Sequence, residues 1–261
     1  MLTLTNITKT FGIGTVNEKK ALKGIDLHLA PGDFVTVLGS NGAGKSTLFG
    51  AIAGSFRPDT GSVILDGQDI TAQPDYKRSK VIGRLFQDPL RGTAPNMTIE
   101  ENMALAYLRA SHARSPFSTV TKADRAEFRE KLSMLGLGLE DRMDHPVGLL
   151  SGGQRQALTL LMATLVTPKL LLLDEHTAAL DPATAEKVLA LTKTIVAENH
   201  ITCMMITHNI PSALALGNRT VMMNDGKIVL ELDGDARKNM TTQELLKVFH
   251  VESDRMLFSA E

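Results

Sequence analysis

Residues 39–47, with the sequence GSNGAGKST, are the group whose types and spacing most directly imply chemistry. They fit the pattern G-x-x-x-x-G-K-[S/T], in which glycines let the backbone turn successive N–H groups toward a phosphate. Lys45 can reach the β- and γ-phosphates of a nucleotide, and Ser46 can offer its hydroxyl to Mg²⁺. The segment therefore predicts a nucleotide site. Its candidate binding residues are Gly39, Ser40, Asn41, Gly42, Ala43, Gly44, Lys45, Ser46 and Thr47.

Two adjacent carboxylates form a second candidate group. Asp174 and Glu175 follow four leucines at 170–173, a run that is typical of a buried strand and too short for a useful helix. Asp174 can hold Mg²⁺ through its water shell, and Glu175 can align and polarise the water that attacks a γ-phosphate. Two solvated acids after a strand are the alternative. Because residues 39–47 already predict a nucleotide, we favour the second half of a phosphoryl-transfer site.

Two more polar residues, Gln87 and His208, follow the apolar runs 81–86 and 201–206. Strand ends are where α/β folds place ligand-contacting groups. The Gln87 amide could coordinate Mg²⁺ or position water, and His208 could contact the γ-phosphate. A solvated loop glutamine and a structural histidine explain the same residues, so neither assignment stands on the residue alone.

Small residues stand at another helix start, in the segment 150–154 with the sequence LSGGQ. Ser151 can cap the helix that follows, and Gly152 and Gly153 allow an anion to approach the exposed backbone amides of this segment, which ends at Gln154. In isolation the pattern is better explained by a well-capped helix without a ligand.

Phe11 is an aromatic residue followed by a loop that contains Gly12 and Gly14. Its ring could stack on an adenine, or it could be an ordinary core phenylalanine. From the residue alone, the core is the better explanation.

The elements that must position these groups alternate between strands and helices. The apolar run 34–38 predicts a buried parallel strand that leads into the phosphate-binding segment, and the residues after Thr47 can begin a helix. Asp181 and Pro182 begin another helix, as its N-cap and first helical residue. The pattern predicts an α/β fold. Further strands are expected at 25–29, 62–65, 81–86, 170–173 and 201–206.

Helical patterns dominate from Thr98 onward, with capping boxes at 98–101 and 121–124 and an irregular loop at 111–116 to which we assign no function. A helical insertion therefore interrupts the strand-rich chain. The predicted parts are an ATP-binding core with an antiparallel β layer at 1–88 and 161–240, a helical subdomain at 89–160, and a C-terminal helix and tail at 241–261.

Composition limits the classes of partner. The chain has 261 residues, with 28 basic and 29 acidic side chains that nearly cancel, so charge gives no reason to expect nucleic acid as a partner. A single cysteine, Cys203, forms no internal disulfide and fits a reducing cytosol. The sequence shows neither a secretion signal nor an apolar run long enough to span a bilayer, so we expect a protein that does not cross a membrane alone.

Taken together and in this order, the motifs resemble an ATP-binding-cassette (ABC) ATPase. The LSGGQ element separates this family from other P-loop NTPases, and the resemblance covers about residues 1–240. It implies an α/β fold with a P-loop NTPase core, an antiparallel β subdomain and an inserted α-helical subdomain. The motifs are GSNGAGKST at 39–47, Gln87, LSGGQ at 150–154, LLLLDE at 170–175, AALD at 178–181 and His208.

The resemblance further implies a head-to-tail dimer with a second copy of the chain, in which each ATP lies between the phosphate-binding segment of one subunit and residues 151–154 of the other. Phe11 then looks like the adenine-stacking aromatic of the family. The matched roles are phosphate binding for Lys45, Mg²⁺ binding for Ser46, Gln87 and Asp174, the catalytic carboxylate for Glu175, a dimer contact for Asp181, and the γ-phosphate switch for His208.

The chain departs from the family pattern at two positions. His176 stands where a proline commonly follows the catalytic glutamate, and Ala178 stands where the family usually has serine. Neither change removes a phosphate or metal ligand. Both bear on the fine geometry and coupling of the dimer interface.

The stretches 87–107, 149–165 and 170–181 look like a bacterial subgroup that works with a separate integral membrane permease and an extracytoplasmic solute-binding protein. That likeness implies uptake of a small organic solute, such as an aromatic amino acid, driven from the cytoplasmic face of the inner membrane. A soluble ABC ATPase in cofactor assembly and an exporter ATPase are the alternatives. A small-molecule kinase is disfavoured because the LSGGQ element argues for hydrolysis.

Overall fold

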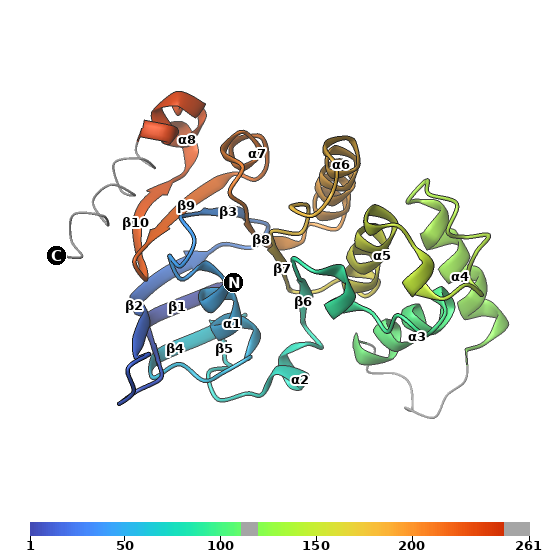
Figure 1. Cartoon of the computed structure of the whole chain (residues 1–261), viewed down its shortest axis with the longest axis horizontal. Coiled ribbons are helices and arrows are strands. Elements are labelled where there is room, and N and C mark those ends of the chain that lie inside the picture. The colour runs from blue at the N-terminus through green and yellow to red at the C-terminus, as the bar shows by residue number, and fades with distance from the viewer. Residues whose placement is uncertain (111–119, 248–261) are drawn as a thin grey trace. The chain divides into compact units, whose positions relative to one another are not determined.

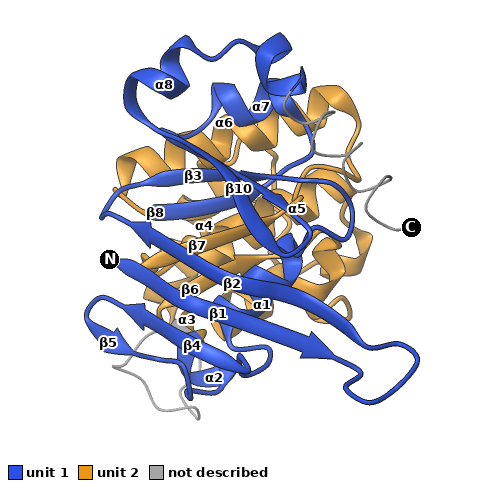
Figure 2. Cartoon of the chain, turned by 90° about the vertical axis from the view of Figure 1, so that its left-hand side faces the viewer, with its two compact units in different colours: residues 1–78, 202–261 blue, residues 79–201 orange. Residues whose placement is uncertain are grey.

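The computed structural model describes residues 1–110 and 120–247, and the chain divides into two compact units (Figure 2). The first unit comprises residues 1–78 and the chain from 202 onward, and the second comprises 79–201. The loop predicted at 111–116 and most of the predicted tail lie outside the described residues. The boundaries predicted at residues 88, 160 and 240 stay predictions.

An antiparallel sheet forms one layer of the first unit. Its strands lie in the order β2-β1-β4-β5, and each strand pairs antiparallel with its neighbour. The alternating pattern at 25–29 indicated such a layer, and the strand there is longer than the pattern suggested. The bounds are β1 Leu2–Phe11, β2 Lys19–Leu29, β4 Thr60–Leu65 and β5 Gln68–Asp69.

A second sheet in this unit is built around β3 (Phe34–Leu38), whose five residues are all buried. Its neighbours β8 (Thr202–Ile206) and β9 (Arg219–Asn224) run parallel to it, and β10 (Lys227–Leu232) pairs antiparallel with β9. The helices of this unit that Figure 1 labels are α1 Lys45–Ala53, α2 Asp75–Arg78, α7 Ile210–Ala215 and α8 Gly234–Asn239.

A buried arginine, Arg78, anchors the end of α1, and only 1% of its surface is exposed. Its Nη1 donates to the carbonyls of Ala51 and Ile52, both at 2.8 Å, in the last turn of the helix. Its Nε donates to Gln73 O at 2.9 Å and its Nη2 to Thr71 O at 3.0 Å. One guanidinium therefore satisfies helix-end carbonyls that would otherwise be buried without donors.

The second unit contains a parallel strand pair and most of the helices. Strands β6 (Ile82–Leu85) and β7 (Leu170–Asp174) match the expected runs closely. The capping boxes predicted at 98–101 and 121–124 are both formed, since each threonine hydroxyl accepts from the third amide of its turn. The helices are η1 Pro89–Gly92, α3 Ile99–Ala110, α4 Lys122–Ser133, η2 Val147–Leu149, α5 Gly152–Thr164 and α6 Pro182–Glu198.

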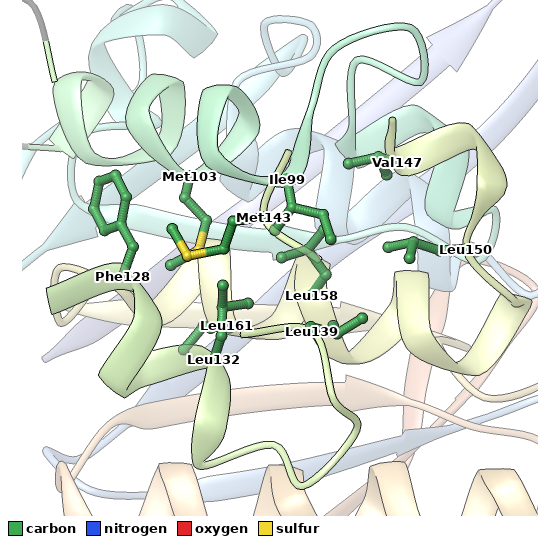
Figure 3. Packing of buried hydrophobic residues seen from close by; sticks show 10 residues of the cluster. All are labelled: Ile99, Met103, Phe128, Leu132, Leu139, Met143, Val147, Leu150, Leu158 and Leu161. Atoms are coloured by element: carbon green, nitrogen blue, oxygen red, sulfur yellow. The ribbon is translucent and has the colours of Figure 1, made fainter. Parts of the chain in front are cut away.

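The helical part of this unit has its own hydrophobic core (Figure 3). Phe128 and Leu132 of α4 are buried in it, and Leu135 packs against it. Burial of these side chains holds α5 against α3 and α4. It therefore also fixes the position of Ser151, the N-cap of α5. The core residues are Ile99, Met103, Phe128, Leu132, Leu139, Met143, Val147, Leu150, Leu158 and Leu161.

Candidate active site

The segment 39–47, predicted to bind phosphate, leaves β3 at Leu38 and turns into α1 at Lys45. Two of its glycines are required by their surroundings. A Cβ at Gly39, where φ is +153°, would lie 2.4 Å from Met223 O, and one at Gly44, where φ is +100°, would lie 2.7 Å from Ala21 O. The loop therefore packs so closely on neighbouring backbone that a side chain at either position would displace it.

Lys45 folds back over this loop and is only 6% exposed. Its ammonium donates to Gly39 O at 2.8 Å and to Ser40 O at 2.9 Å, which places a positive charge inside the turn. The Ser40 hydroxyl is buried and has no hydrogen-bond partner among the described residues. Ser46 is exposed, so its hydroxyl is accessible. A cation, an unpaired buried hydroxyl and the N-terminus of α1 together suit an anion such as a phosphate.

His208 lies at the same edge of the sheet as Gly39. Strands β3 and β8 are parallel with Val37 opposite Ile206, and the amide of Thr207 donates to Val37 O at 3.2 Å. Gly39 and His208 each follow this pair by two residues and thus belong to one edge, as the sequence predicted for parallel strands. His208 is exposed there.

Phe11, at the end of β1, is 41% exposed and is therefore not a core side chain. Its ring meets the ring of Phe56 edge-on, with centroids 5.3 Å apart and planes at 83°. The ammonium of Lys9 lies 5.6 Å and 5.5 Å from the two ring centroids. Stacking of Phe11 on an adenine stays a prediction, and the exposed ring is compatible with it.

In the second unit, Gln87, Asp174 and Glu175 follow the paired ends of β6 and β7, where Leu85 lies opposite Leu173. The structure thus brings the predicted amide and carboxylates to one edge. Sequence reasoning missed Arg84 on β6, whose pKa is lowered by burial and partly raised again by the Asp174 carboxylate. The Arg84 guanidinium therefore lies near enough to the Asp174 carboxylate for their opposite charges to attract.

The segment 151–154 forms a capping box at the start of α5. The Ser151 hydroxyl accepts from the Gln154 amide and Gln154 Oε1 accepts from the Ser151 amide, both at 3.2 Å. Ser151 and Gly152 are exposed and Gly153 is buried. A Cβ at Gly153 would lie 2.1 Å from Thr184 Cγ2, so this glycine allows α5 to approach α6. The well-capped helix is present, and its exposed start leaves room for a ligand.

Asp181 caps α6, since its Oδ1 accepts from the Thr184 amide at 3.1 Å. In the same loop, His176 is 2% exposed and its Nε2 lies 3.2 Å from Thr192 Oγ1 on α6. The sequence flagged His176 as a departure from the family pattern but gave no sign of its burial. Burial lowers the pKa of His176 to about 4 from an ordinary 6.5.

This buried histidine makes stability depend on pH. The folded state keeps the imidazole neutral down to about pH 4, whereas the unfolded chain protonates it near pH 6.5. The unfolded state therefore binds more protons between these values, and stability falls as pH falls through them. We expect the free energy of unfolding to drop by about 3 kcal/mol across this window because of this one group, as measured by urea unfolding of the nucleotide-free chain.

The variant His176→Gln removes the titration but keeps an N–H donor, so its unfolding free energy should vary less over the same window. His145→Gln is the matched control because His145 is exposed, and it should keep the parental pH dependence. Equal pH profiles for the parental chain and His176→Gln would contradict the prediction.

The chain is similar to known proteins in both sequence and structure. The family model described as ABC transporter matches residues 22–178. The tyrosine transport ATP-binding protein of Clostridioides difficile is 40% identical over 249 residues, covering 95% of this chain and 98% of that protein. The bicarbonate transport ATP-binding protein CmpC of Synechococcus elongatus is 39% identical over 234 residues, covering 87% of this chain and 33% of that protein.

Solved structures agree. The dimeric, post-hydrolysis state of the ATP-binding cassette MJ0796, bound to ADP and Pi, has a TM-score of 0.78 at 31% identity and covers 89% of this chain and 98% of its own. The ADP conformation of the cassette MJ1267 has the same TM-score, 0.78, at 27% identity, covering 96% and 98%. These likenesses confirm the predicted fold class.

Proposed function

The chain belongs to the ABC transporter family of ATPases, and from that premise we propose that it drives uptake of a small organic solute, such as an aromatic amino acid, through a separate membrane permease. ATP binding and hydrolysis belong to the family itself. The observation that carries the solute class is the 40% identity to a tyrosine transport ATP-binding protein over nearly the full length of both chains.

Residues 39–47 and His208 hold the phosphates of ATP in this proposal, and Phe11 stacks on its adenine. The closed turn, the internal Lys45 ammonium and the unpaired Ser40 hydroxyl support phosphate binding. Glu175 orients and polarises the attacking water from the edge that follows β7. In this proposal the phosphate-binding residues and Glu175 act on the same ATP molecule. Membership of the family and the complementary chemistry of these residues support the assignment.

The proposal includes Mg²⁺ as a cofactor, with Ser46, Gln87 and Asp174 as the residues that would hold it. Hydroxyl, amide and carboxylate oxygens are the donors that this ion prefers. When bound, Mg²⁺ neutralises the charge that develops on the β- and γ-phosphate oxygens.

Dimerisation completes the site. Two solved structures of the cassette MJ0796 are dimeric, and we place Ser151, Gly152, Gly153, Gln154 and Asp181 of one copy against the ATP of the other. The exposed start of α5 supports this role, because its amides and the helix dipole favour negative charge. Binding of ATP then closes the dimer, and loss of the γ-phosphate opens it.

The proposed location is the cytoplasmic face of the inner membrane, as a peripheral subunit fed by an extracytoplasmic solute-binding protein. In the part of the chain that the structure describes, no helix combines the length and apolar character needed to span a bilayer. The likeness to transport proteins supports the peripheral location.

Uptake of labelled tyrosine by cells that lack this gene tests the proposal. We expect uptake to fall to background, to return with the parental gene, and to stay at background with a Glu175→Gln gene. Related amino acids offered in competition define the solute class. Unchanged uptake of every amino acid tested would contradict an amino-acid importer. Greater accumulation of labelled solute in the deleted cells would also contradict it, because that result is expected of an exporter.

A further inference from the structure

The backbone at Glu175 adopts a conformation that the surrounding structure must hold in place. Its φ is +43°, in the left-handed region that residues with a Cβ seldom adopt. Glu175 is only partly exposed, and the residue after it, His176, is buried. The carboxylate that we assign to the attacking water therefore depends for its direction on what fixes this turn.

The contact between His176 and α6 supplies that fixation. Thr192 is completely buried on α6, and its hydroxyl donates to Val188 O at 2.8 Å. The only proton of that hydroxyl is thus in use, so at 3.2 Å the threonine oxygen accepts from His176 Nε2–H. The imidazole accordingly carries a proton on Nε2, and this one hydrogen bond holds it to the helix.

The other end of the same loop is tied to the same helix. The Asp181 carboxylate accepts from the Thr184 amide at 3.1 Å at the start of α6. Within the loop, the Ala178 amide donates to Glu175 O at 3.0 Å, which closes the turn that follows the carboxylate. Helix α6 therefore holds residues 176–181 at both ends.

We infer that His176 is a positioning residue, which fixes the direction of Glu175 and of the loop 176–181 by its hydrogen bond to Thr192. The inference rests on the proposed role of Glu175. A proline at position 176 could not take over this function, because it carries no side-chain donor in place of the His176 imidazole. His176 contacts no reacting atom in this account. It acts through the conformation of its neighbour.

The test removes the acceptor and leaves the histidine. Thr192→Val in the full chain keeps the shape of the side chain and removes its hydroxyl, so we expect kcat for ATP hydrolysis to fall about 10-fold to 100-fold, as for small displacements of a reacting group. KM for ATP should stay within about 2-fold, because the phosphate-binding segment is untouched. Thr192→Ser restores the acceptor and should restore most of kcat.

Two controls separate positioning from a general loss of structure. Thr194→Val makes the same change two residues further along α6 at an exposed position and should leave kcat unchanged. The double variant Glu175→Gln with Thr192→Val should hydrolyse ATP at the rate of Glu175→Gln alone, because the positioned carboxylate is already gone. Thermal unfolding of each variant confirms that it is folded.

The outcomes are distinguishable. A parental kcat in Thr192→Val, together with a large loss in Glu175→Gln, overturns the inference and leaves the proposed function standing. Additive losses in the double variant, or failure of Thr192→Ser to restore kcat, show a structural role only and also overturn it. A parental rate in Glu175→Gln overturns the catalytic assignment itself, and the inference falls with it.

Discussion

Replacing Glu175 with glutamine will yield a protein that binds ATP and holds it uncleaved in a closed dimer. The amide keeps the size of the side chain but cannot accept a proton from the attacking water, so we expect the hydrolysis rate to fall by about 10²–10⁴. Nucleotide affinity should persist, because the phosphates are assigned to residues 39–47, whose loop is formed by β3 and α1. Phosphate release measures the rate, and gel filtration with ATP and Mg²⁺ measures the dimer.

Glu198→Gln is the matched control for this prediction, since it makes the same chemical change at an exposed position at the end of α6. Its rate should equal the parental rate. Hydrolysis by Glu175→Gln at the parental rate would show that another group orients the water. Loss of ATP binding in that variant would instead show that the carboxylate supports the nucleotide site itself.

Replacing Arg78 with methionine will strongly destabilise the first unit. The change leaves four backbone carbonyls, including two at the end of α1, without the donors that now reach them at 2.8–3.0 Å. A buried carbonyl left without a donor costs about 1–3 kcal/mol, so loss of the two buried hydrogen bonds to α1 should lower the free energy of unfolding by about 2–6 kcal/mol. Urea unfolding of the nucleotide-free chain measures it.

Arg57→Met provides the comparison, because Arg57 is exposed and the substitution is chemically the same. It should change the unfolding free energy by less than about 0.5 kcal/mol. Arg78→Lys keeps the charge but loses the planar fork that reaches several carbonyls, so it should lie between the two. Equal midpoints for Arg78→Met and Arg57→Met would remove Arg78 from the determinants of stability.

The elements that the sequence predicted correctly are those encoded locally. The phosphate-binding segment occupies nine consecutive residues after the run 34–38, and β3 has these same bounds. The run 170–173 likewise predicted β7, and its parallel pairing with β6 brings Gln87 to the carboxylates. A short apolar run is enough to predict each of these strands, because the residues of a buried strand are apolar on both faces.

The features that escaped the sequence depend on residues far apart along the chain. Arg78 lies in a short charged segment, whose composition is typical of an exposed surface. Its contact with the end of α1 forms only in the folded chain. The partner of His176 is Thr192, several helical turns further along. Neither pairing has a local signature, because burial of a polar side chain is decided by which elements pack together.

The adjacent glycines Gly152 and Gly153 are under different constraints although the sequence presents them as one motif. A side chain at Gly153 would collide with Thr184, whereas one at Gly152 would come no nearer than 3.4 Å to Leu180. Gly153 is therefore needed for α5 to pack on α6 within a single copy, before any partner binds. The packing of a single copy leaves space for a side chain at Gly152, so any requirement for glycine there comes from a bound ligand or partner.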